Sequence, residues 1–488
     1  MSAVPDTLTR RSSPALTLAV VLVGVFAVAM SISGAGVAVP RIGAELDASG
    51  AALQWVISAY NLALSAFTLV CGSLSDLFGR KRVFVLTTML FAGGSLVCAL
   101  AQDIVVLDLA RAVAGIGAGG VMASGGAILA VTFDGSARTK AFAAMGTTGG
   151  AGVVTGPFLS GWLVTELGWR ASFVSYVVIG VAILLGTLFV AESRSAERPK
   201  VDRAGVVTFV LGLGLLMFGL IQSPQGGWGG TFGLVAGVVL LVVFVVVERR
   251  QAFPVLDLSL VRNAKFIGWC LGTVSTSVGF VGILVFLPTY FQGVDGATAQ
   301  EAGLTMLMLT LPILVIPMAG GWLVNHGVSA RWLMTSALLL VAGGNAWLTV
   351  LHPGIGVSEL IGPLLSVGIG LGISFGITDA QAMNQVDPAR LGMAAGFLNT
   401  IRNAGEALVI AVFGTALIAL IQTRVGSAEL ANEIAAGELT GGDPAVLAEQ
   451  FTDAWRVALW IVAGICLVAA VVVHTLLGTR RTVAHERV

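Results

Sequence analysis

Residues 72–82 read GSLSDLFGRKR and form a short polar segment between two long apolar runs. Arg80, Lys81 and Arg82 are three consecutive cations, which cannot lie in the hydrocarbon of a bilayer without partners. Basic loops of membrane proteins stay on the cytoplasmic side. The segment therefore predicts a membrane protein and marks its cytoplasmic face, and the side of every other loop follows by alternation.

The composition indicates the same class of protein. The chain has 488 residues, of which 56% are hydrophobic and only 11% are charged, whereas soluble domains carry about 25% charged residues. Its 64 glycines suit closely packed membrane helices. The formal net charge is zero, which argues against nucleic acid as a partner. The four cysteines lie in apolar runs, so we expect buried thiols, and the four histidines show no metal-ligand spacing.

The apolar runs predict an all-α integral membrane protein. The first run, 15–39, is too long for a cleaved signal peptide and suits a retained helix. We expect fourteen transmembrane helices, at residues 15–39, 51–71, 83–101, 104–131, 140–165, 172–191, 204–221, 230–247, 266–291, 301–325, 331–350, 358–381, 391–421 and 455–477.

The basic residues of the loops support this count. With both termini in the cytoplasm, only four basic residues fall in the outer segments, namely Arg41, Arg170, Arg424 and Arg456. This asymmetry is the one that multi-pass proteins show. The longest outer segment, 422–454, is acidic, and we expect a solvated, partly helical loop. The predicted location is the plasma membrane.

A weak internal repeat predicts how the helices are grouped. Residues 321–331, GWLVNHGVSAR, follow the tenth predicted helix as residues 72–81 follow the second, with Asn325 in place of the aspartate. An offset of eight helices equals a six-helix repeat plus two inserted helices. We therefore expect a tail at 1–14, a six-helix bundle at 15–191, a linker with two extra helices at 192–265, a second six-helix bundle at 266–477 and a tail at 478–488.

Two motifs resemble the major facilitator superfamily. Gly72, Asp76, Gly79 and Arg80 match the pattern G-x-x-x-D-x-x-G-R-[KR] of the loop between helices 2 and 3 of that family. Residues 152–161, GVVTGPFLSG, are similar to its antiporter signature G-x-x-x-G-P-x-x-G-G. The resemblance implies that both motifs act in conformational gating, the second through Gly152, Gly156 and Pro157. The alternatives are an ordinary polar turn and ordinary packing of small residues.

Further segments resemble the fourteen-helix drug:proton antiporters of this superfamily. They are 54–60 (QWVISAY), 169–170, 256–258, 262–263 and 396–405 (GFLNTIRNAG). The resemblance thus runs from the first predicted helix to the thirteenth, and it implies two six-helix facilitator halves.

Four charged residues inside the predicted helices are candidates for proton coupling. Arg111 begins the family pattern R-x-x-x-G-x-G, and Asp108 lies three residues earlier on the same helical face. Arg402 and Glu406 are four residues apart near the middle of the thirteenth helix. Charges inside a membrane are costly and mark functional sites by default. Structural ion pairs are the alternative for both sets.

The first helix departs from the subgroup pattern L-D-x-T-x-V-N-V-A-L-P. Counting back from Pro40, its aspartate position is Ser31 and its asparagine position is Gly36. The resemblance implies that coupling needs another carboxylate or is absent. Polar residues that the resemblance places at a substrate cavity are Ser31, Tyr60, Asn61 and Asn399.

The function that the sequence predicts is secondary active export of amphipathic drugs or antibiotics. The chain has no phosphate-binding G-x-x-x-x-G-K-[ST] loop and no recognisable catalytic arrangement, so we expect a transporter without cofactors that uses the proton gradient. Its expected partners are a small amphipathic substrate, protons and the lipid bilayer, and we expect a monomer. Two alternatives stay open: export of a self-made metabolite or lipid, and an uncoupled facilitator or importer.

Overall fold

The computed structural model describes residues 13–193, 203–223, 228–250, 263–386 and 391–478. In these ranges the chain is helical and contains no strand. The helices are α1 (Pro14–Leu46), α2 (Gly50–Phe78), α3 (Arg80–Leu100), α4 (Ile104–Thr132), α5 (Gly135–Leu167), α6 (Trp169–Gly186), the 3₁₀ turn η1 (Thr187–Phe189), α7 (Arg203–Gln222), α8 (Trp228–Glu248), α9 (Ala264–Val294), α10 (Ala299–Thr310), α11 (Pro312–Asn325), α12 (Ala330–Leu348), α13 (Val357–Met383), α14 (Leu391–Val425), α15 (Ala428–Ala435) and α16 (Pro444–Gly478).

These helices confirm an all-helical membrane protein. Within the described residues, eleven helical segments are long and apolar enough to cross a bilayer. Helical structure covers each of the fourteen predicted runs, and one run is divided between α10 and α11. The division lies at Pro312, which cannot donate a backbone hydrogen bond to the preceding turn. All four cysteines are buried and free, as predicted.

The segment 422–454 is more helical than its composition indicates. α14 continues to Val425, α15 follows at Ala428–Ala435, and residues 444–454 form the first turns of α16. The expected partly helical character of this segment is confirmed, but the last helix begins at Pro444 and not at the predicted residue 455. Buried Phe451 and Thr452 anchor this part of α16, and Thr452 forms a 2.7 Å hydrogen bond with the Tyr290 hydroxyl of α9.

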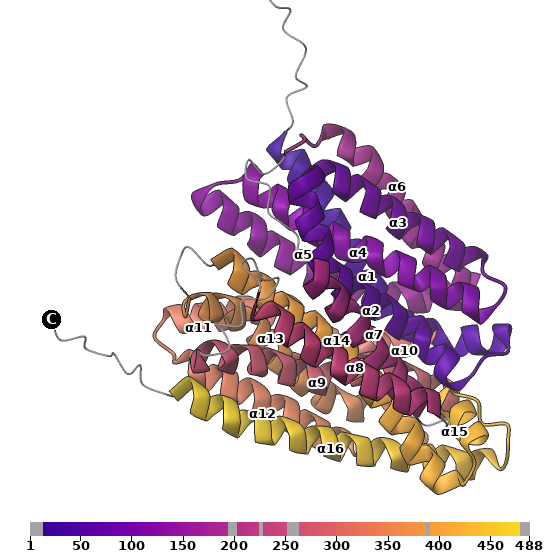
Figure 1. The fold of residues 1–488 in the computed structure, drawn as a ribbon. Helices are drawn as coiled ribbons and strands as arrows, with labels where there is room; N and C mark the ends of the chain where they lie inside the picture. Colours follow the sequence, from indigo (N-terminus) through magenta and orange to yellow (C-terminus); the bar gives the residue numbers. More distant parts are fainter. Residues whose placement is uncertain (1–12, 194–202, 224–227, 251–262, 387–390, 479–488) are drawn as a thin grey trace, which may run out of the picture.

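The helices form two groups that are consecutive in the chain. α1–α6 pack against one another, and α9–α16 do the same. Figure 1 shows the two groups side by side. We call these groups the first half and the second half. Small residues allow close approach within a half: a Cβ at Gly117 would lie 2.3 Å from the Phe91 nitrogen, and one at Gly370 would lie 2.6 Å from the Ala337 carbonyl oxygen.

Helices α7 and α8 form a separate hairpin between the halves. They pack tightly on each other, and α7 also contacts both α2 and α14. Met217 and Ile221 of α7 are buried, and the Thr415 hydroxyl of α14 donates a 3.0 Å hydrogen bond to the Leu220 carbonyl. The outer surface of α8 is apolar and exposed, as expected for a helix that faces lipid.

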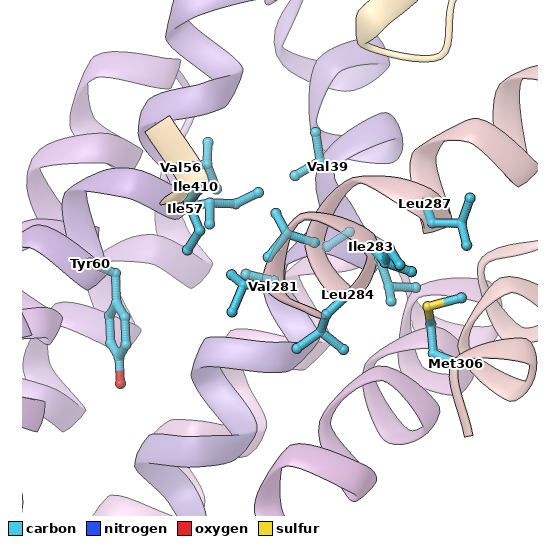
Figure 2. Packing of buried hydrophobic residues seen from close by; sticks show 14 of the residues in the cluster. Val39, Val56, Ile57, Tyr60, Val281, Ile283, Leu284, Leu287, Met306 and Ile410 are labelled. Atoms are coloured by element: carbon cyan, nitrogen blue, oxygen red, sulfur yellow. The ribbon is translucent and has the colours of Figure 1, made fainter. Parts of the chain in front are cut away.

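The two halves meet at the end of the bundle that carries the α1–α2 turn (residues 47–49) and α15, which we call the closed end. Here α1 and α2 pack on α9 and α14 in one continuous apolar core, which Figure 2 shows around Val39, Ile57, Leu284 and Ile410. Hydrogen bonds also connect the halves at this end. They join Gln54 to Ala411, Gln292 to Val37 and Gln300 to Thr165.

Candidate functional site

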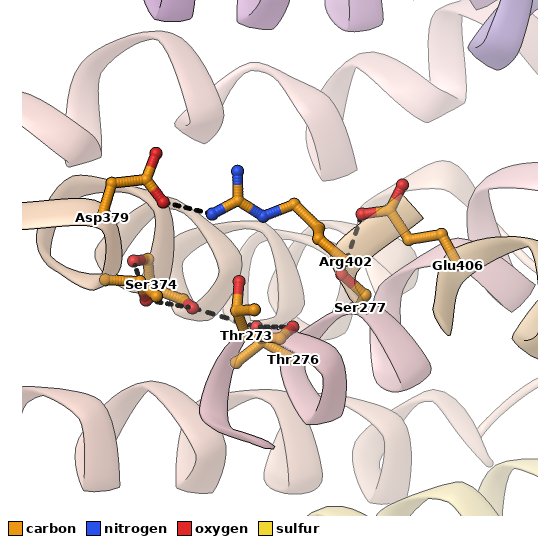
Figure 3. Close-up of polar contacts among 8 residues, drawn as sticks. Thr273, Thr276, Ser277, Ser374, Asp379, Arg402 and Glu406 are labelled. Atoms are coloured by element: carbon orange, nitrogen blue, oxygen red, sulfur yellow. Dashed lines mark hydrogen bonds and ion pairs between the residues drawn. The ribbon is translucent and has the colours of Figure 1, made fainter. Parts of the chain in front are cut away.

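Glu406 on α14 is a half-buried carboxylate inside the second half. Its Oε1 accepts a 3.1 Å hydrogen bond from the hydroxyl of Ser277 on α9, as Figure 3 shows. Ser277 itself is 1% exposed, so its position is set by packing. Glu406 is thus held by a neutral partner, and it forms no ion pair with any described residue.

Arg402, one turn before Glu406, pairs with another carboxylate. Its guanidinium bonds to Asp379 on α13, and its Nε is buried without a hydrogen-bond partner in the described residues. The Phe375 ring lies 5.4 Å from the guanidinium carbon. The Arg402 side chain is 15% exposed and that of Asp379 is 61% exposed, so this pair reaches toward solvent. The expected Arg402–Glu406 pair is therefore replaced by a pair between two helices.

Buried hydroxyl groups surround these charges on the side of α9 and α13. Thr276 donates a 3.0 Å hydrogen bond to Ser374, and the Ser374 and Thr378 hydroxyls lie 3.4 Å apart. The nearby Thr273 hydroxyl is buried without a partner in the described residues (Figure 3). This region of the second half is polar although it lies within apolar helices.

Arg111 is the corresponding charge of the first half. It is 1% exposed on α4, and its Nε donates a 2.7 Å hydrogen bond to the Val56 carbonyl. Its Nη1 donates to the Ser31 hydroxyl at 3.1 Å, and its guanidinium carbon lies 4.2 Å from the Tyr60 ring centre. All these partners are neutral, because Ser31 occupies the position where the subgroup pattern has aspartate.

Asp108 does not neutralise Arg111 by direct contact. No ion pair joins the two residues in the described part of the chain, and Asp108 Oδ1 is buried without a hydrogen-bond partner there. The spacing of Asp108 and Arg111 in the sequence places them on one face of the helix, but it does not bring their charged groups into contact. Asp108 lies nearer the start of α4 than Arg111, and it is half-buried there.

The polar residues expected at a substrate cavity point into helix packing. The Tyr60 hydroxyl is buried and donates to the Val28 carbonyl at 3.4 Å. Asn61 is buried and donates to the Ile57 carbonyl one turn earlier at 3.0 Å. The side chain of Asn399 lies outside the described residues.

The segment 72–82 forms the end of α2 and the start of α3, joined at Gly79. Gly79 has φ +109°, a conformation that favours glycine, and a Cβ there would lie 2.7 Å from the Glu192 carboxylate. A Cβ at Gly72 would lie 3.8 Å from the Ala123 methyl group, which is ordinary contact. The side chain of Asp76 lies outside the described residues.

Glu192 is the residue of this region that sequence reasoning missed. Its carboxylate accepts a 3.1 Å hydrogen bond from the Lys81 amide and lies 3.6 Å from Arg82. Beside it, the Arg80 amide donates to the Ser193 carbonyl at 2.9 Å. An acid directly after an apolar run was a visible signal in the sequence. The start of α3 is thereby tied to the end of the first half.

The glycines of the second motif bring α5 against α1. A Cβ at Gly152 would lie 2.6 Å from the Phe26 carbonyl oxygen, and one at Gly156 would lie 2.0 Å from the Ser33 hydroxyl. Next along α5, the Pro157 carbonyl oxygen lies 2.3 Å from the position of a Cβ on Gly303 of α10. The motif therefore forms one contact within the first half and one between the halves.

Comparison with known proteins decides the family. The family model described as the Major Facilitator Superfamily matches residues 21–410. The chain belongs to the major facilitator superfamily. It is 30% identical over 415 residues to the multidrug resistance protein Stp of Mycobacterium tuberculosis, covering 83% of this chain and 76% of that protein. It is 29% identical over 477 residues to the puromycin resistance protein pur8 of Streptomyces alboniger, covering 96% and 92%.

Solved structures agree with the fold of this facilitator. The POT family transporter PepTSo superposes with a TM-score of 0.67 at 16% identity, covering 94% of this chain and 97% of that one. A bacterial homologue of the lysosomal transporter Spinster, in an inward-facing conformation, gives 0.65 at 16% identity, covering 96% and 98%. The chain is therefore a multi-pass membrane transporter and not an enzyme.

Proposed function

We propose that this facilitator is a secondary active exporter of amphipathic small molecules, and that it exchanges them for protons. The tetracenomycin C resistance and export protein of Streptomyces glaucescens is 29% identical over 511 residues, covering 98% of this chain and 94% of that protein. Together with Stp and pur8, it supports export of drugs or antibiotics.

The observation that carries the proton proposal is the environment of Glu406. This carboxylate has a hydroxyl partner, Ser277, but no cation among the described residues in direct contact, because Arg402 is engaged with Asp379. Its proton affinity therefore depends on its contact with water and on the distance to Arg402. Alternating access changes both, so Glu406 takes a proton from one side and releases it to the other.

The proposed topology has fourteen spans. The helices α2, α5 and α12, added to the eleven apolar segments, give this number. It makes both termini cytoplasmic, groups the spans as two six-helix halves with α7 and α8 as the insertion, and puts the closed end outside. Single cysteines introduced at Ser136 and Gly441 should then be labelled from opposite sides of the membrane. Labelling from one side refutes the count.

A transport assay tests the proposal. The purified protein is reconstituted in proteoliposomes. Uptake of puromycin by the transporters that are oriented inside-out is measured with and without a pH gradient that makes the lumen acidic. Accumulation of puromycin against its concentration gradient, lost when a protonophore collapses the pH gradient, supports proton-driven export. A panel of amphipathic cations and neutral antibiotics extends the assay if puromycin is not a substrate.

A second candidate function is uncoupled facilitation, including import. It is favoured by Ser31, because the first half offers Arg111 only neutral partners and no carboxylate in contact with it among the described residues. In the same vesicles an uncoupled facilitator equilibrates the substrate at the same rate with or without the pH gradient, and never accumulates it.

A further inference from the structure

Gln54 connects the two halves at the closed end. It lies in the first part of α2 and is 5% exposed, and its Nε2 donates a 3.0 Å hydrogen bond to the Ala411 carbonyl of α14. Gly414 makes this approach possible, because a Cβ there would lie 2.5 Å from Gln54 Nε2 and 2.9 Å from the Phe286 ring. Gln54 is also the first residue of the segment QWVISAY, to which the proposed transport mechanism assigns no function.

The second polar atom of this amide has no partner in the part of the chain that the structure describes. Gln54 Oε1 is buried and accepts no hydrogen bond from a described residue. A buried amide oxygen without a partner costs free energy, so such groups are normally satisfied by protein or water.

Gln54 lines a cavity between the halves. The cavity measures about 30 Å³ and is bordered by α1 and α2 of the first half and by α9, α14 and α15 of the second, including Thr289 and Asn432. A cavity needs roughly 10–15 Å³ to hold one water molecule, and polar partners to keep it. Gln54, Thr289 and Asn432 offer such groups, whereas the room excludes anything as large as an amphipathic drug.

We propose that this cavity is a water-binding site and that Gln54, with its bound water, is the residue that sets how readily the closed end opens. In the closed state Gln54 is satisfied by Ala411 on one side and by water on the other. When the halves part, bulk water replaces both partners at little cost. An apolar residue of the same length favours the closed state more strongly, because opening exposes it to water.

This inference rests on alternating access, which is part of the proposed function, but its test needs neither a substrate nor a pH gradient. A single cysteine at Leu417, which is 2% exposed and lines the cavity, reports opening. The four native cysteines are replaced by serine, the protein is placed in nanodiscs, and the rate of maleimide labelling is measured.

Two variants should change this rate in opposite directions. Gln54→Leu is expected to slow labelling about three- to tenfold, since it removes the polar group that makes opening inexpensive. Gly414→Ala is expected to accelerate it by a similar factor, because its methyl group displaces the amide from Ala411. Ser58→Ala on α2 and Gly343→Ala on α12 are the controls, since Ser58 does not border the cavity and a Cβ at Gly343 meets open space.

Labelling that changes in the same direction in both variants, or in neither, overturns the role of Gln54. The bound water is tested separately by X-ray radiolytic footprinting, in which radiolysis of ordered water produces hydroxyl radicals that oxidise the side chains beside it. We expect oxidation of buried Leu53, another cavity residue, in the wild type and several-fold less in Gln54→Leu. Equally weak oxidation in both proteins overturns the water site. If these outcomes are obtained but the transport assay fails, the proposed function is wrong and the role of Gln54 stands.

Discussion

Arg402 on α14 pairs with Asp379 on α13, although Glu406 is the carboxylate one turn away on its own helix. The two members of the pair differ in their surroundings, because Arg402 is 15% exposed and Asp379 is 61% exposed. Removal of the Asp379 charge and removal of the Arg402 charge should therefore lower the stability by different amounts.

We expect Asp379→Asn to destabilise the protein more than Arg402→Gln. The first change leaves a largely buried guanidinium without its counterion, at a cost of about 1–2 kcal/mol, whereas the second leaves a carboxylate that water can solvate. Thermal unfolding in detergent measures the difference, with Asp453→Asn, whose partly exposed carboxylate pairs with Arg424 and Arg456, as a control. Equal loss of stability in both variants contradicts the asymmetry.

The contact between α5 and α1 predicts a position-dependent effect of added methyl groups. Gly156→Ala forces a Cβ against Ser33 and Met30, while Gly126→Ala on α4 meets open space. We expect a loss of about 1–3 kcal/mol and impaired transport for the first change only, since overpacking displaces the backbone. Gly156→Leu should abolish export while still inserting into the membrane. Wild-type transport by both Gly156 variants at matched expression removes the gating role of this motif.

The conformation of the turn at Gly79 should matter as much for stability and transport as the charged residues of the same segment. Gly79→Ala places a side chain at φ +109° and close to Glu192, which costs about 1–3 kcal/mol. Glu192→Gln keeps the hydrogen bond to the Lys81 amide and should cost less, because the carboxylate is partly solvated. Asp76→Asn, in the same motif, is expected to impair export with normal insertion. Unfolding curves and transport rates of the three variants, measured side by side, give the order; a Gly79→Ala protein as stable as the wild type contradicts it.

The hairpin of α7 and α8 is predicted to move with the second half. α7 is hydrogen-bonded to α14 through Thr415, whereas it meets α2 through apolar contacts such as that between Gly214 and Leu62. A bifunctional cross-link between cysteines at 62 and 214 should therefore stop transport, whereas one between cysteines at 220 and 415 should not. The reverse result assigns the hairpin to the first half.

Much of the fold is predictable from the sequence because apolar runs of about twenty residues have one stable solution in a bilayer. The motif at Gly156 is readable for a similar reason, since glycines one turn apart on a helix indicate a close neighbour. Partners on other helices are not predictable in this way. Asp379 stands 23 residues before Arg402, and Val56 stands 55 before Arg111, so only packing shows that they meet.

The extent of α16 and the role of Gln54 illustrate the same limit. Residues 444–454 fall in the predicted outer segment, but contacts of Phe451 and Thr452 with α9 hold them as the first turns of α16. Gln54 is one polar residue in an amphipathic stretch, and its partner Ala411 offers only a backbone carbonyl. No side-chain pattern indicates such a contact.

The central claim is that Glu406 carries the proton that drives export. The direct measurement is drug-dependent proton flux in proteoliposomes, for the wild type, Glu406→Gln and Ser277→Ala. Glu406→Gln should bind the drug but lose proton flux and uphill transport, because the amide does not titrate, while Ser277→Ala should reduce the flux only a fewfold through loss of one hydrogen bond. Asp108→Asn, on α4, should have the smaller effect of the two carboxylate changes. Proton flux at the wild-type ratio to drug in Glu406→Gln contradicts the claim, makes this carboxylate structural and moves the search for the coupling site to Asp108 or Asp76.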